Sequence, residues 1–234
     1  MTSLLAVLLI APFMAQADVT IANVAAPSIH ADLGTSGAEL ELVIGGYLVA
    51  FAVLLITGAR LGQTHGYRRM FLAGIAAFTG ASALSGLAPT PAVLIAARVL
   101  QGAGAALMFP QTLTGIQLAF TGPARVRAIG LYAIALSAGA VSGQLLGGAL
   151  ISADLLGSGW RAIFLVNVPI GLVALVAGAR RLPADDHRAS RRSSSAAPRA
   201  GPPGRGSRSL RALRRSRCSS SLSDGSPRAT GLRS

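Results

Sequence analysis

Long apolar stretches dominate the first 182 residues of the chain. Six of them lie near residues 3–26, 40–60, 70–88, 92–116, 127–151 and 160–179. A helix needs about 20 mostly apolar residues to cross the hydrocarbon core of a bilayer, which is about 30 Å thick. Each stretch must satisfy its own backbone groups in lipid, and the alternating pattern of a membrane barrel is absent. The sequence therefore predicts an all-α membrane protein with six transmembrane helices in residues 1–182.

Charged residues in the loops predict how these helices are oriented. Arginines gather in the loops on one side, at Arg60, Arg68, Arg69, Arg125, Arg127, Arg180 and Arg181. The loops on the other side are mainly acidic, with Asp32, Glu39, Glu41 and Asp154 against Arg161 alone. Cytoplasmic loops carry the excess of basic residues in helical membrane proteins. We therefore expect a multi-pass protein of the cell membrane with both termini in the cytoplasm.

The first stretch has an alternative interpretation. An apolar run followed by Ala15-Gln16-Ala17 is also typical of the end of a cleaved signal peptide. However, no basic residue precedes the run, and apolar character resumes from Val19 to Pro27. We therefore favour an uncleaved first span.

The composition changes after residue 182. Residues 183–234 are rich in Arg, Ser, Pro and Gly, and their 12 arginines and 3 acids give a balance of +9 out of the formal +13. Such a segment buries too little apolar surface to offset the entropy of ordering. We predict a disordered basic tail, and we favour a frameshift or rearranged 3′ end as the origin of residues after about 184. The alternative is binding of anionic lipid or acidic polymers. No aromatic residue interleaves the arginines, so no specific nucleic-acid partner is expected.

Soluble-enzyme chemistry has little support in this sequence. About 60% of residues 1–181 are apolar, whereas roughly half is usual in soluble domains. The single cysteine, Cys218, excludes a disulfide within one chain, and His30, His65 and His187 lie in three separate segments. No metal-binding or nucleophile motif is present. We expect no enzymatic activity, no metal and no cofactor.

Two ionisable residues lie well inside the predicted spans, Asp18 in the first and Arg98 in the fourth. Each would cost about 2.5–3.5 kcal/mol at a helix centre facing lipid. At about 1.5 Å per residue, both lie roughly 10–13 Å from the same membrane face. We therefore expect them to face inward and to pair. The pair is either a structural tether or a titratable switch, because burial and a nearby cation act in opposite directions on the pKa of a carboxyl group.

Glycines recur at every fourth position of the fifth stretch, at Gly139, Gly143 and Gly147, joined by Gly148. A helix face without side chains lets another backbone approach closely. A weaker pattern relates two halves of the chain, because residues 66–71 are similar to residues 159–164 and each run opens a third span. Inverted repeats of three helices each would produce this pattern.

Five motifs, in order, resemble those of the major facilitator superfamily and, within it, the drug:proton antiporter branch with fourteen spans. They are residues 18–27, the loop run 61–69, the run R-x-x-Q-G-x-G from Arg98, the glycine run 139–148, and residues 159–171 with Trp160, Arg161, Asn167 and Pro169. The resemblance implies the amino-terminal six-helix bundle of the major facilitator fold, built from 3+3 inverted repeats. It also implies an export function driven by a proton gradient, with small organic compounds or drugs as substrates.

The resemblance assigns expected roles to individual residues. Proton coupling and the substrate cavity would involve Asp18, Arg98 and Gln101. The gating motif would comprise Gly58, Gly62, Gln63, Gly66, Arg68 and Arg69. Helix packing would involve Gly139, Gly143, Gln144, Gly147 and Gly148.

The sequence departs from the branch in three places. Gln63 stands where the branch usually has an acid, Thr64 where it has a base, and Gln144 where it often has proline. The resemblance ends near Leu182, where the branch continues with eight more spans. We therefore predict an exporter truncated to its first half, which needs a separate carboxy-terminal half or a second copy to transport. The alternative is a nontransporting remnant or assembly subunit in the membrane.

Overall fold

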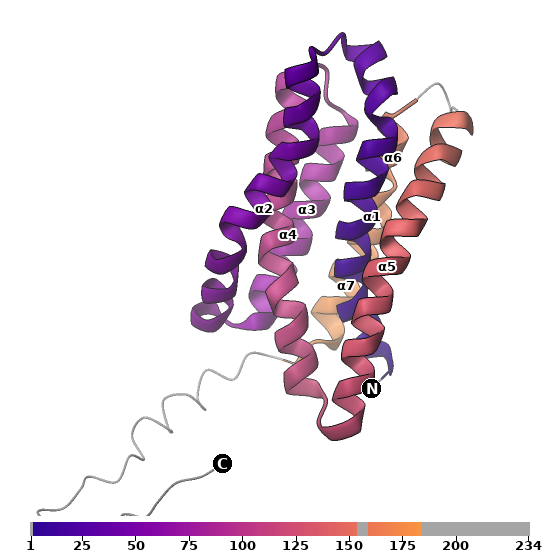
Figure 1. Ribbon diagram of the computed structural model, residues 1–234. Helices are drawn as coiled ribbons and strands as arrows, with labels where there is room; N and C mark the ends of the chain where they lie inside the picture. The colour runs from indigo at the N-terminus through magenta and orange to yellow at the C-terminus, as the bar shows by residue number, and fades with distance from the viewer. Residues whose placement is uncertain (1, 154–158, 184–234) are drawn as a thin grey trace, which may run out of the picture. The chain divides into compact units, whose positions relative to one another are not determined.

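The computed structural model describes residues 2–153 and 159–183, which form helices joined by short connections (Figure 1). The helices are α1 (Thr2–Leu33), α2 (Gly37–His65), α3 (Tyr67–Gly86), α4 (Pro91–Ala119), α5 (Gly122–Ala153), α6 (Arg161–Leu165) and α7 (Asn167–Arg181). This part of the chain contains no strand. The tail predicted at residues 183–234 lies almost wholly outside the described residues.

Local sequence signals set where the helices begin. The Glu39 carboxylate accepts a hydrogen bond from the backbone N–H of Ser36 (2.7 Å), and the Ser36 hydroxyl accepts one from the backbone N–H of Glu39 (3.2 Å). This reciprocal pair is a capping box at the start of α2. Thr90 caps α4 in front of Pro91. Gly66 has φ 95°, a conformation that glycine adopts without strain. This single residue therefore separates α2 from α3.

The last predicted span, at residues 160–179, is interrupted at Val166. Pro169 has no backbone N–H to donate to the Leu165 carbonyl, and its ring crowds that carbonyl. The segment is therefore divided into α6 and α7, although the two pieces together still count as one candidate span, Arg161–Arg181. The break places Asn167 at the first position of α7.

Within the described residues, five helical segments are long and apolar enough to cross a membrane: α1, α2, α4, α5 and the α6–α7 segment. The third predicted span corresponds to α3, which is not among the five. Several small or polar residues of α3 are buried, namely Gly74, Thr79, Ser82, Ser85 and Gly86. These residues lower the hydropathy of α3. Because they are buried between helices, their polar groups are not exposed to lipid.

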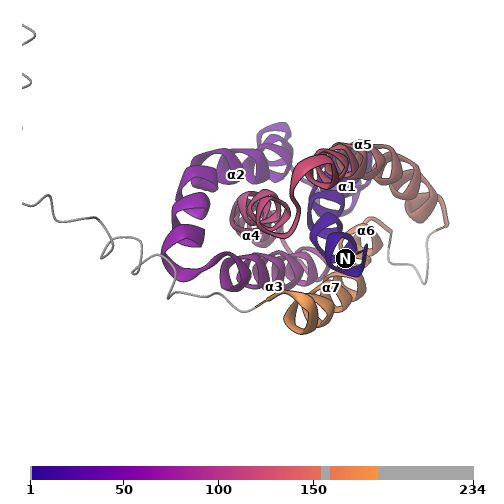
Figure 2. The ribbon, with the colours of Figure 1, turned by 90° about the horizontal axis from the view of Figure 1, so that it is seen from below.

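The helices pack around α1 and α4 (Figure 2). α4 lies against α2 and α3, while α1 lies against α5 and α7. One core cluster includes Leu8, Phe71, Phe78 and Met108, and a second includes Ile29, Leu94 and Phe164. α1 and α4 also contact each other, so that their inward-facing side chains meet inside the bundle.

Candidate functional site

Asp18 of α1 and Arg98 of α4 form an ion pair inside the bundle. Nη1 of Arg98 donates to Oδ2 of Asp18 at 2.5 Å. The exposed fractions are 0% for Asp18 and 1% for Arg98. The predicted pairing of these two residues is therefore present. A charge buried this deeply is tolerated only with a partner and with further hydrogen bonds.

Two amide side chains complete the surroundings of the Asp18 carboxylate. Oδ1 accepts from Nε2 of Gln101 (2.7 Å) and from Nδ2 of Asn167 (2.9 Å). Gln101 lies almost one helical turn after Arg98, and its Oε1 accepts from the same Nη1 (2.8 Å). Asn167 reaches the carboxylate from the start of α7. The two charges are therefore held by three helical segments.

The hydrogen-bond network extends to α2 and α3. Nε2 of Gln101 also donates to Oγ of Ser82 (2.8 Å), which in turn donates to the Phe78 carbonyl (2.9 Å). Nε of Arg98 donates to the Val43 carbonyl (3.1 Å). Five helical segments, α1, α2, α3, α4 and α7, thus meet in one buried polar network.

Two aromatic rings flank the Arg98 guanidinium. Its Cζ lies 4.6 Å from the ring centroid of Tyr47 and 5.6 Å from that of Phe164, within the range of cation–π attraction. Tyr47 also lines a pocket of about 210 Å³, together with Ala15, Gln16, Val19, Leu48, Phe51, Phe109 and Leu136. One tyrosine ring is therefore in contact with both the ion pair and the pocket.

Aromatic residues from three helices form a row beside this pocket. Phe51 stacks with Tyr47 (centroids 6.5 Å apart), and Phe109 meets Phe51 edge-on (5.2 Å). Tyr132 of α5 meets Phe109 edge-on (6.3 Å). These pairs have the geometries that aromatic rings prefer, and Tyr47, Phe51 and Phe109 line the pocket with aromatic carbon.

The residues predicted for the gating motif lie in two places. Around the turn between α2 and α3, Nη2 of Arg68 donates to the Ala179 carbonyl at the end of α7 (2.5 Å). Gly66 provides the turn, and Gln63 and Arg69 are exposed. Arg68 therefore connects the start of α3 to the end of α7.

Gly58 and Gly62 lie within α2, where it crosses α4. A Cβ at Gly58 would collide with the backbone of Ala106, and one at Gly62 would collide with the side chain of Gln111. Nε2 of Gln111 donates to the Gly58 carbonyl (2.9 Å). The two glycines thus make close packing between α2 and α4 possible.

The glycines of α5 face α1. Added Cβ atoms at Gly139, Gly143 and Gly147 would meet Phe13, Ala17 and Ile21, together with neighbours of these residues. Gln144 is exposed, and a Cβ at Gly148 would meet nothing within 4 Å. One residue further along a helix is about 100° further around it, so Gln144 and Gly148 lie off the contact that their neighbours make.

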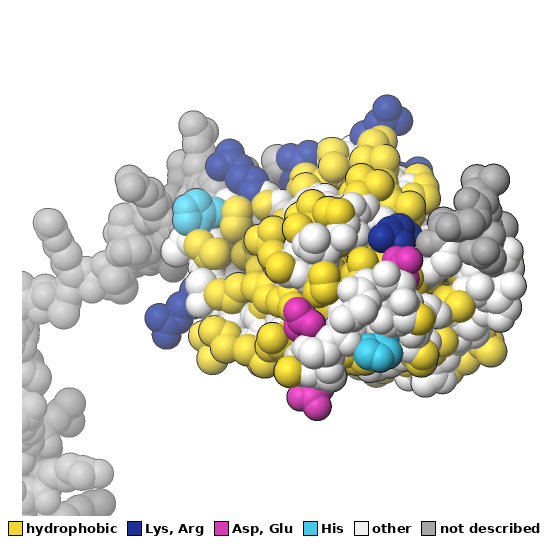
Figure 3. Space-filling view, turned by 90° about the horizontal axis from the view of Figure 1, so that it is seen from above, with side chains coloured by type: hydrophobic (Ala, Val, Ile, Leu, Met, Phe, Trp, Pro, Cys, Tyr) yellow, Lys and Arg dark blue, Asp and Glu magenta, His cyan; other side chains and the backbone are white. Residues whose placement is uncertain are grey.

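Trp160 and Arg161 lie away from Asp18, at the start of α6. Nε1 of Trp160 (2.9 Å) and Nη1 of Arg161 (2.6 Å) both donate to Oδ2 of Asp32, near the end of α1. The Arg161 guanidinium also covers the Trp160 ring at 4.6 Å. Figure 3 looks onto this end of the bundle, where separate acidic side chains lie at a largely apolar surface. Pro169 is exposed, and its role is to interrupt the helix.

Sequence reasoning missed Ser82, Tyr47 and Phe164 as members of the site. None of them carries a charge, so none is conspicuous in an apolar helix. A depth comparison would have found Tyr47, which lies roughly 15 Å along α2 from Gly37 by the helical rise, near the predicted depth of Asp18. Within residues 2–153 and 159–183, no cluster of three or more His, Cys, Asp or Glu could hold a metal.

The helical bundle and its buried ion pair define a membrane-embedded protein of the transporter type. The chain belongs to the Major Facilitator Superfamily, whose family model matches residues 8–222. It is 45% identical over 179 residues to a probable actinorhodin transporter of Streptomyces coelicolor, covering 76% of this chain and 31% of that protein. It is 46% identical over 173 residues to the cephamycin export protein CmcT of Amycolatopsis lactamdurans, covering 74% and 35%.

Solved structures show the same fold. A bacterial homologue of the human lysosomal transporter Spinster, in an inward-facing and occupied conformation, superposes with TM-score 0.67 at 23% identity, covering 82% of this chain and 47% of that one. The proton:xylose symporter XylE superposes with TM-score 0.66 at 15% identity, covering 76% and 44%. The chain spans about a third of the length of the two curated relatives.

Proposed function

We propose that the chain forms the amino-terminal bundle of a proton-coupled exporter of small organic compounds in the cell membrane. The observation that carries the proposal is the buried Asp18 carboxylate, held by Arg98, Gln101 and Asn167. Ionisable residues inside membrane spans are expensive and typically serve ion or proton pathways. The similarity to a probable actinorhodin transporter and to a cephamycin export protein supports an export function.

Protonation of Asp18 would disturb the network directly. All three of its side-chain partners present N–H donors to the carboxylate. A carboxyl group that gains a proton becomes a donor itself, so at least one partner must turn away. Arg98 would keep its bonds to Val43 and Gln101. Proton uptake would therefore loosen α1 from α4 and from α7 and leave Arg98 in place.

The pocket beside Tyr47 is proposed as the contact surface for the exported compound. Its volume of about 210 Å³ is below the roughly 300–1,000 Å³ of pockets that enclose drug-sized ligands. We infer that a second bundle supplies the rest of the cavity. Ala15, Gln16 and Val19 of α1 also line this pocket, so a shift of α1 on proton uptake would change its shape.

The distribution of charge supports an orientation with both termini in the cytoplasm. The basic loops lie after α2 and α4 and at the end of α7, and basic loops face the cytoplasm. On this side Arg68 links α3 to the end of α7. We propose that the link contributes to gating, because it would have to break if α3 and α7 moved apart.

Transport is proposed to require a second bundle. Carriers of this type rock two bundles around a site between them, and the chain spans about a third of its curated relatives. The second bundle would be a separate carboxy-terminal half or a second copy. The alternative function is that of a nontransporting remnant or assembly subunit in the membrane.

Accumulation of a fluorescent cation such as ethidium in an efflux-deficient host tests these functions. The chain would be expressed alone and together with the remaining spans of the Streptomyces coelicolor relative. We expect accumulation below that of the empty vector at least in the second case. Asp18→Asn should abolish this reduction, and the control Glu41→Gln, at an exposed position, should retain it. Accumulation equal to empty vector in both cases, with the protein found in the membrane, would leave the nontransporting alternative.

A further inference from the structure

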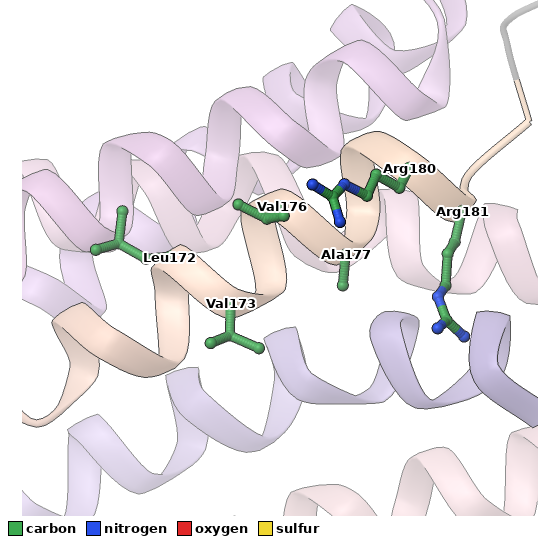
Figure 4. Close-up of a pocket in the computed structure, with 6 residues that line it drawn as sticks. All are labelled: Leu172, Val173, Val176, Ala177, Arg180 and Arg181. Carbon is green, nitrogen blue, oxygen red and sulfur yellow. The ribbon is translucent and has the colours of Figure 1, made fainter.

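α7 carries an open groove of about 400 Å³ on its outer surface (Figure 4). Among the described residues it is lined by Leu172, Val173, Val176, Ala177, Arg180 and Arg181. These residues fall into two rows with a spacing of four, which places each row along one face of the helix. Each row consists of two apolar residues followed by an arginine. The groove is therefore apolar along most of its length and cationic at one end.

The apolar part of the groove is exposed to the surroundings. The exposed fractions are 52% for Leu172, 64% for Val173 and 50% for Val176. By the helical rise, the distance from residue 172 to residue 180 is roughly 12 Å. This length suits part of an extended hydrocarbon chain lying parallel to the helix.

The cationic end concentrates positive charge at the end of α7. Arg180 and Arg181 are exposed, and among the described residues no carboxylate forms a salt bridge with either. The guanidinium of Arg68 lies on the Ala179 carbonyl, so a third cation is present at the same turn. A guanidinium binds phosphate oxygens through paired, charge-assisted hydrogen bonds.

We propose that this groove is a binding site for an anionic phospholipid. One acyl chain lies along the two apolar rows, and the headgroup phosphate lies between Arg180 and Arg181. Charge complementarity favours this occupant over the carboxy-terminal segment of the same chain, whose balance is +9. It also favours a lipid over free phosphate, which would leave the apolar rows uncovered. The inference does not depend on the proposed transport function.

Native mass spectrometry of the full chain, released from bilayers of equal phosphatidylglycerol and phosphatidylcholine, tests this site. We expect retained phosphatidylglycerol to exceed retained phosphatidylcholine by about tenfold, because each arginine near an anionic headgroup contributes favourably. Arg180→Gln/Arg181→Gln should bring the ratio close to one. The matched control Arg60→Gln/Arg127→Gln removes the same charge from two other exposed arginines and should keep the preference.

A second variant separates the groove from the charges. Val176→Trp fills the apolar rows and keeps both arginines, and we expect it to lose the retained lipid. Equal preference in the arginine variant and the wild type would overturn the proposal. So would displacement of the lipid by inorganic phosphate alone, or cross-linking of Val176→Cys to residues after 183 in place of lipid.

Discussion

Two opposite faces of the same turns of α1 make different kinds of contact. One face presents Asp18, whose carboxylate is held by Arg98 and two amide side chains. The other presents Ala17 and Thr20, against which α5 brings Gly143 so close that an added Cβ would collide with them. The first contact depends on which polar atoms are present, whereas the second depends on the absence of a side chain.

This difference separates two tasks within one helix. A polar network can change its hydrogen bonds when a proton arrives, because its partners are side chains that can turn. A contact between backbones has no such freedom. We therefore expect the α1–α5 contact to stay closed while the contacts of α1 with α4 and α7 change.

The largest loss of stability should come from removing one partner of the buried ion pair. Arg98→Met leaves the Asp18 carboxylate buried without its cation, which costs about 3–5 kcal/mol in comparable pairs. We expect the free energy of unfolding in detergent to fall by that amount. The control is Arg60→Met, at an exposed position, and a loss as small as that of the control would contradict the network.

A smaller loss should follow from removing one amide donor. Asn167→Ala deletes one hydrogen bond to the carboxylate, and bonds to charged groups contribute about 1.5–3 kcal/mol. The exposed Asn23, which donates to the Val19 carbonyl, provides the control Asn23→Ala. Equal losses in the two variants, measured by the same unfolding assay, would show that Asn167 does not hold Asp18.

The glycine contact predicts effects of opposite sign for two glycines of α5. Gly143→Ala pushes a methyl group into Ala17 and Thr20, and overpacking of this kind typically costs about 1–3 kcal/mol. Gly148→Ala meets nothing within 4 Å and should stabilise by up to about 1 kcal/mol through helix propensity. Thermal unfolding measures both effects. Destabilisation of similar size in the two variants would contradict the placement of Gly143 against α1 and of Gly148 away from it.

The smallest effect is expected at the end of α1. The side chains of Arg161 and Asp32 are 32% and 46% exposed, and exposed pairs contribute about 0.2–1 kcal/mol. Arg161→Gln should therefore lower stability slightly, and the loss should shrink in high salt. A loss that is large and independent of salt would show that this pair belongs with the buried network.

Much of the fold and part of the site could be predicted from the sequence. Runs of about 20 apolar residues located the helices, and depth along two helices paired Asp18 with Arg98. The resemblance named Gln101 and Asn167 but not their shared contact with the Asp18 carboxylate. Asn167 reaches Asp18 because the helix break before α7 sets the direction of its side chain. The spacing of apolar residues along the sequence does not reveal such a break.

The rotation of each helix about its axis was the main thing that the sequence left open. α5 is apolar over most of its length, so no polar stripe indicates which of its faces is inward. Gly148 was grouped with Gly147 for this reason, although the structure separates their surroundings. Ser82 was missed for the same reason, because its hydroxyl becomes informative only when α3 is placed against Gln101.

A double-mutant cycle on the ion pair tests the central claim most directly. The free energy of unfolding would be measured for the wild type, Asp18→Asn, Arg98→Met and the double variant. We predict that each single substitution destabilises strongly and that the double variant is more stable than the sum of the two losses would allow, because it leaves no buried charge unpaired. Strictly additive losses would show that Asp18 and Arg98 do not interact.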